Sequence, residues 1–137
     1  MIIGFTGTRQ DMSNEQKRKV KELCEQMNLE ESHHGGCHGA DETFHNICVQ
    51  LKEELPIVIH PGDDNQAGQN WRGEDVTILD VKSYLARNKD IVNESDIMIA
   101  TPKGDEEMRS GTWSTIRYAK KINKPIYIVF PDGRIER

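Results

Sequence analysis

The sequence predicts a three-layer α/β fold, in which helices cover both faces of a five-stranded, mainly parallel sheet. Short apolar runs alternate along the chain with amphipathic segments of helical period, and this order is typical of parallel strands joined by helices. Glycine-rich turns follow several of these runs, where a strand would end and a helix begin. The length of 137 residues suits one hydrophobic core, so we expect a single domain over residues 1–137.

The first half of the chain contains three expected strands and two expected helices. The strands are predicted from apolar runs, or from their place before a turn, at residues 2–6, 31–34 and 56–60. Ser13 and Gln16 have the spacing of a capping box, and apolar residues at helical spacing then predict a helix over 14–28. A second helix is expected to begin near Ala40, because the apolar residues that follow share one helical face.

The second half of the chain begins with a long polar segment. Residues 62–79 are irregular, and a segment of this length in a small domain is usually a lid, a binding loop or a mobile connection. Asp80 is expected to cap the third helix, and Ser110 the fourth. The remaining strands are predicted from apolar runs at residues 96–100 and 125–130. The tail after the last strand is expected to fray.

The net charge and the cysteine content indicate which binding partners and which cellular compartment to expect. The formal net charge is −5, which disfavours sequence-independent binding to nucleic acid, because such binding needs a basic face. The three cysteines predict reduced thiols rather than a disulfide framework. The apolar start, residues 1–5, is too short for a signal peptide or a membrane span. We therefore expect a cytoplasmic protein without a membrane partner.

The stretch that begins at Arg109 has the composition of an anion-binding helix start. Ser110 is a good N-cap, and Gly111 lacks the Cβ atom that would keep a ligand away from the backbone. Unpaired N–H groups and the positive end of the helix dipole favour an anion there. The guanidinium of Arg109 and the hydroxyl groups of Thr112 and Thr115 suit a phosphate. The alternative is an ordinary capped helix with a solvated first turn.

Two further glycine-rich turns are expected beside this helix. The carboxyl ends of parallel strands share one edge of a sheet, where α/β folds bind ligands at a switch in strand order. The candidate ligand contacts on these turns are Gly7, Thr8, Arg9, Gly35, Gly36 and Gly39. Asp41 follows the second turn, where it would bind a ribose hydroxyl, act as an acid or base, or cap the second helix.

A segment rich in histidine and cysteine raises a zinc hypothesis. Its ligand-type residues are His33, His34, Cys37, His38 and His45. The spacing of His34 and Cys37 suits a metal, but no second pair completes a tetrahedral set at the usual spacing. We therefore predict no metal and no resident cofactor. Trp71, in the long polar segment, either stacks on a base or anchors that segment to the domain.

Five segments occur in the order in which they are found in a superfamily of Rossmann-like nucleotide-binding domains. They lie at residues 4–9 (GFTGTR), 35–41 (GGCHGAD), 59–61 (IHP), 86–88 (ARN) and 109–112 (RSGT). The chain thus resembles the SLOG superfamily, which includes the LOG phosphoribohydrolases, the DNA-processing protein DprA and small stand-alone proteins of the YspA/YpsA type. The resemblance implies ligand contacts from His38, Arg87 and Pro102, and assembly into a homo-oligomer.

The resemblance does not extend to the catalytic carboxylate of the LOG enzymes. Their motif is Pro-Gly-Gly-x-Gly-Thr-x-x-Glu, and Thr115 stands here at the position of the Glu. The candidate catalytic carboxylates of this chain are then Asp41, Glu106 and Glu107.

These observations together lead to one leading interpretation of function. We expect the chain to bind a phosphorylated nucleotide or a nucleotide-derived small molecule, with its phosphate at Gly111 and Thr112. One alternative is an enzyme that cleaves or transfers the N-glycosidic bond of a nucleoside monophosphate. A second alternative is DprA-like binding of single-stranded DNA, which the acidic balance of the chain disfavours.

Overall fold

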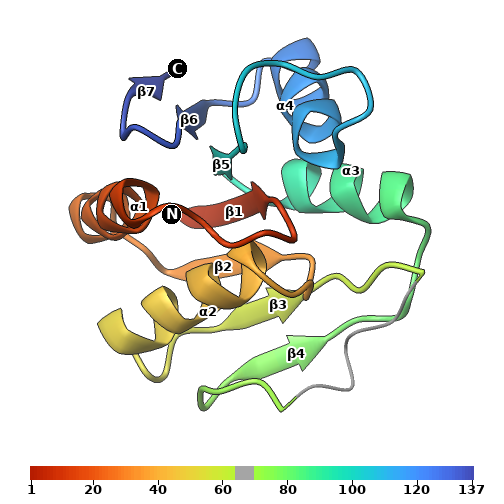
Figure 1. Ribbon diagram of the computed structural model, residues 1–137. Helices are drawn as coiled ribbons and strands as arrows, with labels where there is room; N and C mark the ends of the chain where they lie inside the picture. Colours follow the sequence, from red (N-terminus) through yellow and green to blue (C-terminus); the bar gives the residue numbers. More distant parts are fainter. Residues whose placement is uncertain (64–69) are drawn as a thin grey trace.

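The computed structural model describes residues 1–63 and 70–137, and in this part of the chain seven strands form one sheet covered by four helices (Figure 1). The strands are β1 (Ile2–Gly7), β2 (Glu31–His34), β3 (Ile57–Ile59), β4 (Val76–Ile78), β5 (Ile97–Thr101), β6 (Ile126–Val129) and β7 (Ile135–Glu136). The helices are α1 (Asn14–Gln26), α2 (Ala40–Leu51), α3 (Tyr84–Glu94) and α4 (Gly111–Lys121). Among these described residues, no helix is long and apolar enough to cross a membrane.

The helices form two layers, one on each face of the sheet. Helices α1 and α2 pack against each other on one face, and α3 and α4 do so on the other (Figure 1). Each interface contains its own apolar cluster; Phe5 and Phe44 stack in the first, and Trp113 packs near Phe130 in the second. The predicted three-layer architecture and the mainly parallel sheet are therefore confirmed, with β6 and β7 as the antiparallel pair.

The strand order β4-β3-β2-β1-β5-β6-β7 places β1 at the centre of the sheet. The chain first adds strands on one side of β1, as far as β4, and then returns to add β5 and β6 on the other side. At such a reversal the connections leave neighbouring strands in opposite directions, which opens a crevice at the carboxyl ends of those strands. The crevice of this protein is therefore expected beside the ends of β1 and β5.

The sheet has seven strands rather than the expected five. The two strands that were not expected, β4 and β7, are short, largely exposed and lie at the two edges of the sheet. Strand β4 lies inside the segment predicted to be irregular and pairs in parallel with β3. Strand β7 lies in the tail that was expected to fray and pairs with β6. The run at residues 76–79 is rich in β-branched residues but lies within a polar segment, and the tail after Pro131 has Ile135 as its one aliphatic residue. Residues 64–69, part of the segment interpreted as a lid or binding loop, lie outside the described residues.

Helix α3 begins later than expected, with Ser83 rather than Asp80 as its N-cap. The Ser83 hydroxyl accepts a hydrogen bond from the backbone N–H of Ala86 at 3.2 Å, which satisfies one of the unpaired donors of the first turn. The later start places Tyr84 at the first helical position and Arg87 one turn further on. Both side chains consequently project from the same end of α3 toward the crevice.

Helix α1 begins as predicted, with the capping box of Ser13 and Gln16. The buried amide of Gln16 also donates to the carbonyl oxygens of Pro102 and Val129, at 2.8 and 2.9 Å. One side chain thus caps its own helix and holds the backbone just after β5 and at the end of β6. The hydrogen bond to Pro102 therefore fixes the beginning of the loop that leads from β5 to α4.

Candidate functional site

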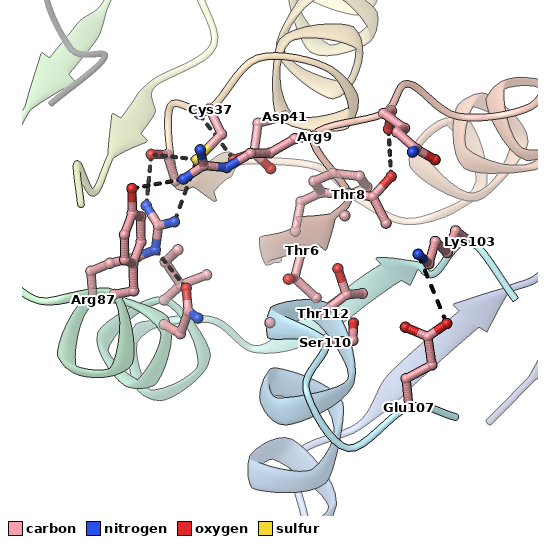
Figure 2. A pocket seen from close by; sticks show the side chains of 18 of the residues that line it. Thr6, Thr8, Arg9, Cys37, Asp41, Arg87, Lys103, Glu107, Ser110 and Thr112 are labelled. Carbon is pink, nitrogen blue, oxygen red and sulfur yellow. Dashed lines mark hydrogen bonds and ion pairs between the residues drawn. The ribbon is translucent and has the colours of Figure 1, made fainter. Parts of the chain in front are cut away.

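A cavity of about 540 Å³ occupies the crevice between the carboxyl ends of β1 and β5 (Figure 2). Its walls come from the end of β1 and the following turn, the β2–α2 turn, the first two turns of α3, and the loop and first turn of α4. This volume lies within the range of about 300–1,000 Å³ that is typical of small-molecule sites. The cavity therefore has the position and the size of a ligand site in an α/β protein.

The start of α4 forms one wall of the cavity. Ser110 caps the helix by accepting from the backbone N–H of Trp113 at 3.2 Å, and Thr112 lies buried at the cavity surface. A Cβ atom added to Gly111 would meet nothing within 4 Å, so the backbone of the first turn is open to the cavity. Figure 2 shows Ser110 and Thr112 across from Thr6 and Thr8. Backbone donors and hydroxyl groups thus face one space.

Arg87 forms the opposite wall and is only 7% exposed. Its Nη1 donates to the carbonyl oxygens of Gly35 and His60 at 2.8 and 2.9 Å, and its Nε donates to Asn88 Oδ1 at 2.5 Å. Its Nη2 lies 3.4 Å from the sulfur of Cys37. The guanidinium therefore joins α3, the β2–α2 turn and the end of β3, and most of its donors are used inside the protein.

Tyr84 lines the cavity and lies close to two guanidinium groups. Its ring centroid is 5.0 Å from the guanidinium carbon of Arg87 and 5.5 Å from that of Arg9. Arg9 Nη2 also donates to the Tyr84 hydroxyl oxygen at 2.7 Å. Tyr84 and the two arginines thus form one cluster of cation–π contacts in the cavity lining.

The β2–α2 turn gets its shape from two glycines with positive φ. Gly36 has φ of 70° and Gly39 has φ of 83°, a backbone region that other residues rarely adopt. The backbone N–H of Ala40 donates to the carbonyl oxygen of Thr8 at 3.0 Å, so this turn is held against the turn that follows β1. These glycines shape the wall without lining the cavity.

Asp41 is a buried carboxyl group in the cavity wall, 7% exposed, and it accepts a hydrogen bond from the backbone N–H of Cys37 at 3.2 Å. Burial raises the pKa of Asp41 to about 6, although the neighbouring Arg87 guanidinium acts to lower it. Burial also raises the pKa of the Cys37 thiol, and the Asp41 charge adds to that effect. At neutral pH the wall thus contains a carboxylate close to its titration range and a protonated thiol.

The raised pKa of Asp41 predicts a specific dependence of stability on pH. The folded state binds this proton more tightly than the unfolded chain, whose carboxyl has the ordinary value of 3.8. The stabilisation is complete below about pH 4 and is lost as the pH rises through about 6. Relative to D41N, which cannot titrate there, the wild type should lose on the order of 3 kcal/mol between about pH 4 and pH 7. Urea unfolding at a series of pH values measures the free energy of unfolding of both proteins. A wild-type-to-D41N difference in that free energy that stays constant with pH would contradict the prediction.

The structure brings together most of the residues singled out in the sequence. The predicted site residues that line the cavity are Gly7, Thr8, Arg9, Gly35, Asp41, Arg87, Glu107, Arg109, Ser110, Gly111 and Thr112. Those that do not line it are Gly36, His38, Gly39, Pro102, Glu106 and Thr115. Three of these have other contacts: Glu106 pairs with Arg117 at 2.9 Å, His38 lies 3.7 Å from Glu42, and the Thr115 hydroxyl donates to the Gly111 carbonyl oxygen at 2.9 Å.

Several cavity residues were not among the predicted ligand contacts, including Thr6, Gln10, Cys37, Tyr84, Asn88 and Lys103. Cys37 was singled out as a candidate zinc ligand instead. Tyr84 and Arg87 have helical i, i+3 spacing, so the interest in Arg87 could have identified Tyr84 once the helix start was known. Trp71 does not line the cavity; its ring lies 5.2 and 4.9 Å from the rings of His34 and His45. These contacts favour the interpretation of Trp71 as an anchor.

The cavity is cationic, although the chain as a whole has a net charge of −5. Its charged lining residues are the basic Arg9, Arg87, Lys103 and Arg109 and the acidic Asp41 and Glu107. Glu107 lies 3.9 Å from Lys103, so part of its charge is balanced locally. Positive charge thus lies in a crevice that also contains a helix N-terminus, which is the arrangement expected of an anion site.

Comparison with known proteins shows the fold of this chain. No protein-family profile and no curated protein matches it. A molybdenum cofactor binding protein from the phototrophic bacterium Rippkaea orientalis has a similar structure, with a TM-score of 0.70 and 21% identity over 94% of this chain and 76% of that one. TM1055, a structural-genomics target, also has a similar structure, with a TM-score of 0.65 and 16% identity over 91% of this chain and 71% of the TM1055 chain. The chain is therefore an α/β protein with the same overall fold as these two.

Proposed function

We propose that the cavity binds a phosphorylated nucleotide or a nucleotide-derived small molecule, and that the chain is a SLOG-type domain. The observation that carries this proposal is the concentration of basic side chains in a cavity that includes the first turn of α4, in a protein with a net charge of −5. A cavity of about 540 Å³ has room for a nucleotide-sized ligand. The described binding of a molybdenum cofactor by one structurally similar protein adds support for a small-molecule ligand.

The phosphate group belongs at the start of α4. The open backbone at Gly111 provides N–H donors, the buried Thr112 provides a hydroxyl group, and the exposed Arg109 provides a guanidinium. An anion there gains from charge-assisted hydrogen bonds and from the helix dipole at once. Lys103 lies at the same wall and adds a further positive charge.

The base and the ribose then lie toward the opposite wall. Arg9 is exposed and lines the cavity, and the plane of a guanidinium group can stack on different bases. Asp41 lies deeper in the same wall, at a position suited to a ribose hydroxyl. This orientation uses both halves of the cavity lining.

The double variant of Arg109→Ala and Thr112→Val tests the phosphate position. Each side chain would make a hydrogen bond to a charged group, a contact worth about 1.5–3 kcal/mol, so we expect the affinity for adenosine monophosphate to fall by more than about tenfold. Isothermal titration calorimetry measures the affinity. The matched control combines Arg134→Ala and Thr77→Val, since neither residue lines the cavity. Equal affinities of the test and control variants would contradict the phosphate position.

The raised pKa of Asp41 favours a second candidate function, cleavage of an N-glycosidic bond in the bound nucleotide. A carboxyl group that titrates near pH 6 can act as an acid or a base at neutral pH. Incubation with a panel of nucleoside monophosphates, followed by chromatography for the free base, tests it. Release of base by the wild type but not by D41N would establish the reaction, and no release by either would leave binding alone.

The homo-oligomer implied by the SLOG resemblance stays a prediction. Native mass spectrometry of the purified protein would report the number of subunits. The same spectrum would show a retained ligand by its mass. A monomer would contradict the prediction on assembly without affecting the proposed site.

A further inference from the structure

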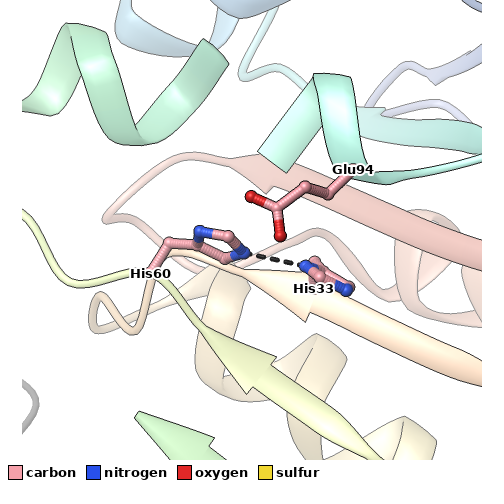
Figure 3. Close-up of side chains that lie close together, drawn as sticks. All are labelled: His33, His60 and Glu94. Atoms are coloured by element: carbon pink, nitrogen blue, oxygen red, sulfur yellow. Dashed lines mark hydrogen bonds between the residues drawn. The ribbon is translucent and has the colours of Figure 1, made fainter. Parts of the chain in front are cut away.

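Two histidines lie side by side under α3, away from the cavity described above (Figure 3). His33 is on β2, His60 directly follows β3, and each is only 3% exposed. Nδ1 of His33 lies 2.7 Å from Nε2 of His60. Successive residues of a strand face opposite sides of a sheet, so His34 instead faces α2, where its Nε2 lies 2.8 Å from Nδ1 of His45. The sheet thus separates the histidines into two pairs.

Glu94 adds a carboxylate to the His33–His60 pair. It is the last residue of α3, and Figure 3 shows its carboxylate directed at the two rings. One carboxylate oxygen and one ring nitrogen of each histidine all lie within 4.8 Å of one another. The group therefore combines two imidazoles, held rigidly by burial, with a carboxylate on an exposed and adjustable side chain.

Glu31 gives His33 the tautomer that a metal ligand needs. The other ring nitrogen of His33, Nε2, lies 2.6 Å from Oε2 of Glu31. A carboxylate in that position holds the proton on Nε2 and leaves the lone pair of Nδ1 directed at His60. A histidine whose second nitrogen donates to a carboxylate is the usual arrangement at metal centres, because it fixes the ring and raises its basicity.

We propose that His33 Nδ1, His60 Nε2 and the Glu94 carboxylate bind a divalent transition-metal ion of the Zn²⁺ class, with a fourth position open to water or another ligand. Two imidazoles and one carboxylate are a known ligand set for Zn²⁺. At Zn–N distances of 2.0–2.1 Å the two nitrogens of a tetrahedral site lie about 3.3 Å apart. The observed 2.7 Å must therefore widen by about 0.6 Å. The two rings, whose centroids are 5.0 Å apart, must also turn so that both lone pairs point at the ion, and the proton shared by the pair moves to His60 Nδ1.

The charges around this centre are of both signs. The carboxylates of Glu31 and Glu94 belong to the group itself, and Asp90 also interacts electrostatically with His60. The opposing cations near His60 are Arg87 and Lys82, and Lys82 is paired with Asp90 at 2.6 Å. The centre connects to the cavity wall, because the His60 carbonyl oxygen accepts from Arg87. Metal binding would thus hold β2, the end of β3 and the end of α3 together.

Titration of the chelator-treated full chain with Co²⁺ tests the proposal, because tetrahedral Co²⁺ has visible absorption bands that report its ligands. We expect one Co²⁺ per chain, displaced by Zn²⁺, and a rise in melting temperature with added Zn²⁺. H33Q and H60Q should each abolish the bands, and E94Q should weaken Co²⁺ affinity about tenfold or more. E31Q, which removes only the positioning contact, should weaken affinity by about 10–100-fold.

The controls distinguish a specific site from general effects. H38Q and E25Q replace exposed residues of the same types, and H45Q replaces a buried histidine of the other pair. All three should keep the wild-type affinity and spectrum, and circular dichroism verifies the fold of each variant. E94Q remains informative even if the buried histidine variants unfold, because Glu94 is exposed. Absence of stoichiometric Co²⁺ binding by the wild type, or wild-type affinity in folded E94Q and H60Q, would overturn the proposal.

Discussion

Replacing Arg87 with alanine is expected to lower the free energy of unfolding by about 3–5 kcal/mol and to abolish ligand binding in the cavity. The substitution removes hydrogen bonds to the buried carbonyl oxygens of Gly35 and His60 and leaves both without these donors. It also leaves the buried Asp41 carboxylate without its neighbouring cation. The β2–α2 turn and the end of β3 would then lose their connection to α3.

Two further variants make the Arg87 experiment specific. R87K keeps the positive charge but not the planar fork that reaches several acceptors, so its unfolding free energy should lie between those of the wild type and R87A. R18A removes an exposed arginine that forms ion pairs with Glu15 and Glu22 on its own helix, and it should change stability little. Urea denaturation followed by circular dichroism measures all of them. An R87A protein as stable as R18A would show that the Arg87 contacts contribute nothing net.

Replacing Gly39 with alanine is expected to cost at least about 3 kcal/mol of folding free energy. Gly39 has φ of 83° and ψ of −122°, a combination that residues with a Cβ atom rarely adopt. The added Cβ would lie 2.2 Å from the backbone carbonyl oxygen of Arg9 and 2.9 Å from that of Thr8. Since both neighbours are backbone atoms, they cannot move away without separating the two turns that form the cavity wall.

G104A is the matched control for G39A. A Cβ atom at Gly104 would meet nothing within 4 Å, and its φ lies outside the positive region. Its free energy of unfolding should therefore differ from that of the wild type by less than about 1 kcal/mol. Chemical denaturation gives both values, and calorimetry with adenosine monophosphate shows whether G39A also weakens binding. Equal stability of the two variants would contradict the argument from the turn geometry.

The layered architecture was predictable because it depends on local patterns. Apolar runs such as the one after Asp96 alternate with segments of helical period, and that alternation is enough to indicate parallel strands with helices on both faces. The edge of the sheet that carries the cavity followed from the same order, because the glycine turns come after the strands. Gly7, Gly35 and Gly111 therefore line the crevice where they were expected.

The edge strands of the sheet were not predicted. Strand β4 contains Thr77 and the exposed Ile78, and β7 consists of Ile135 and Glu136. Such short segments become strands only when a neighbouring strand offers its unpaired backbone groups. The start of α3 was also predicted wrongly. Asp80 and Ser83 are both residue types that cap helices well, and Ser83 is the N-cap in the structure.

The order of strands and helices, and with it the edge of the sheet that carries the cavity, was already contained in the sequence, since periodicity and turn residues act over a few neighbouring positions. The burial of Arg87, the raised pKa of Asp41 and the meeting of His33 with His60 were decided only by the tertiary structure. These features join residues that lie far apart along the chain. Their chemistry depends on desolvation and on distances of a few ångströms, which no local pattern of residues encodes.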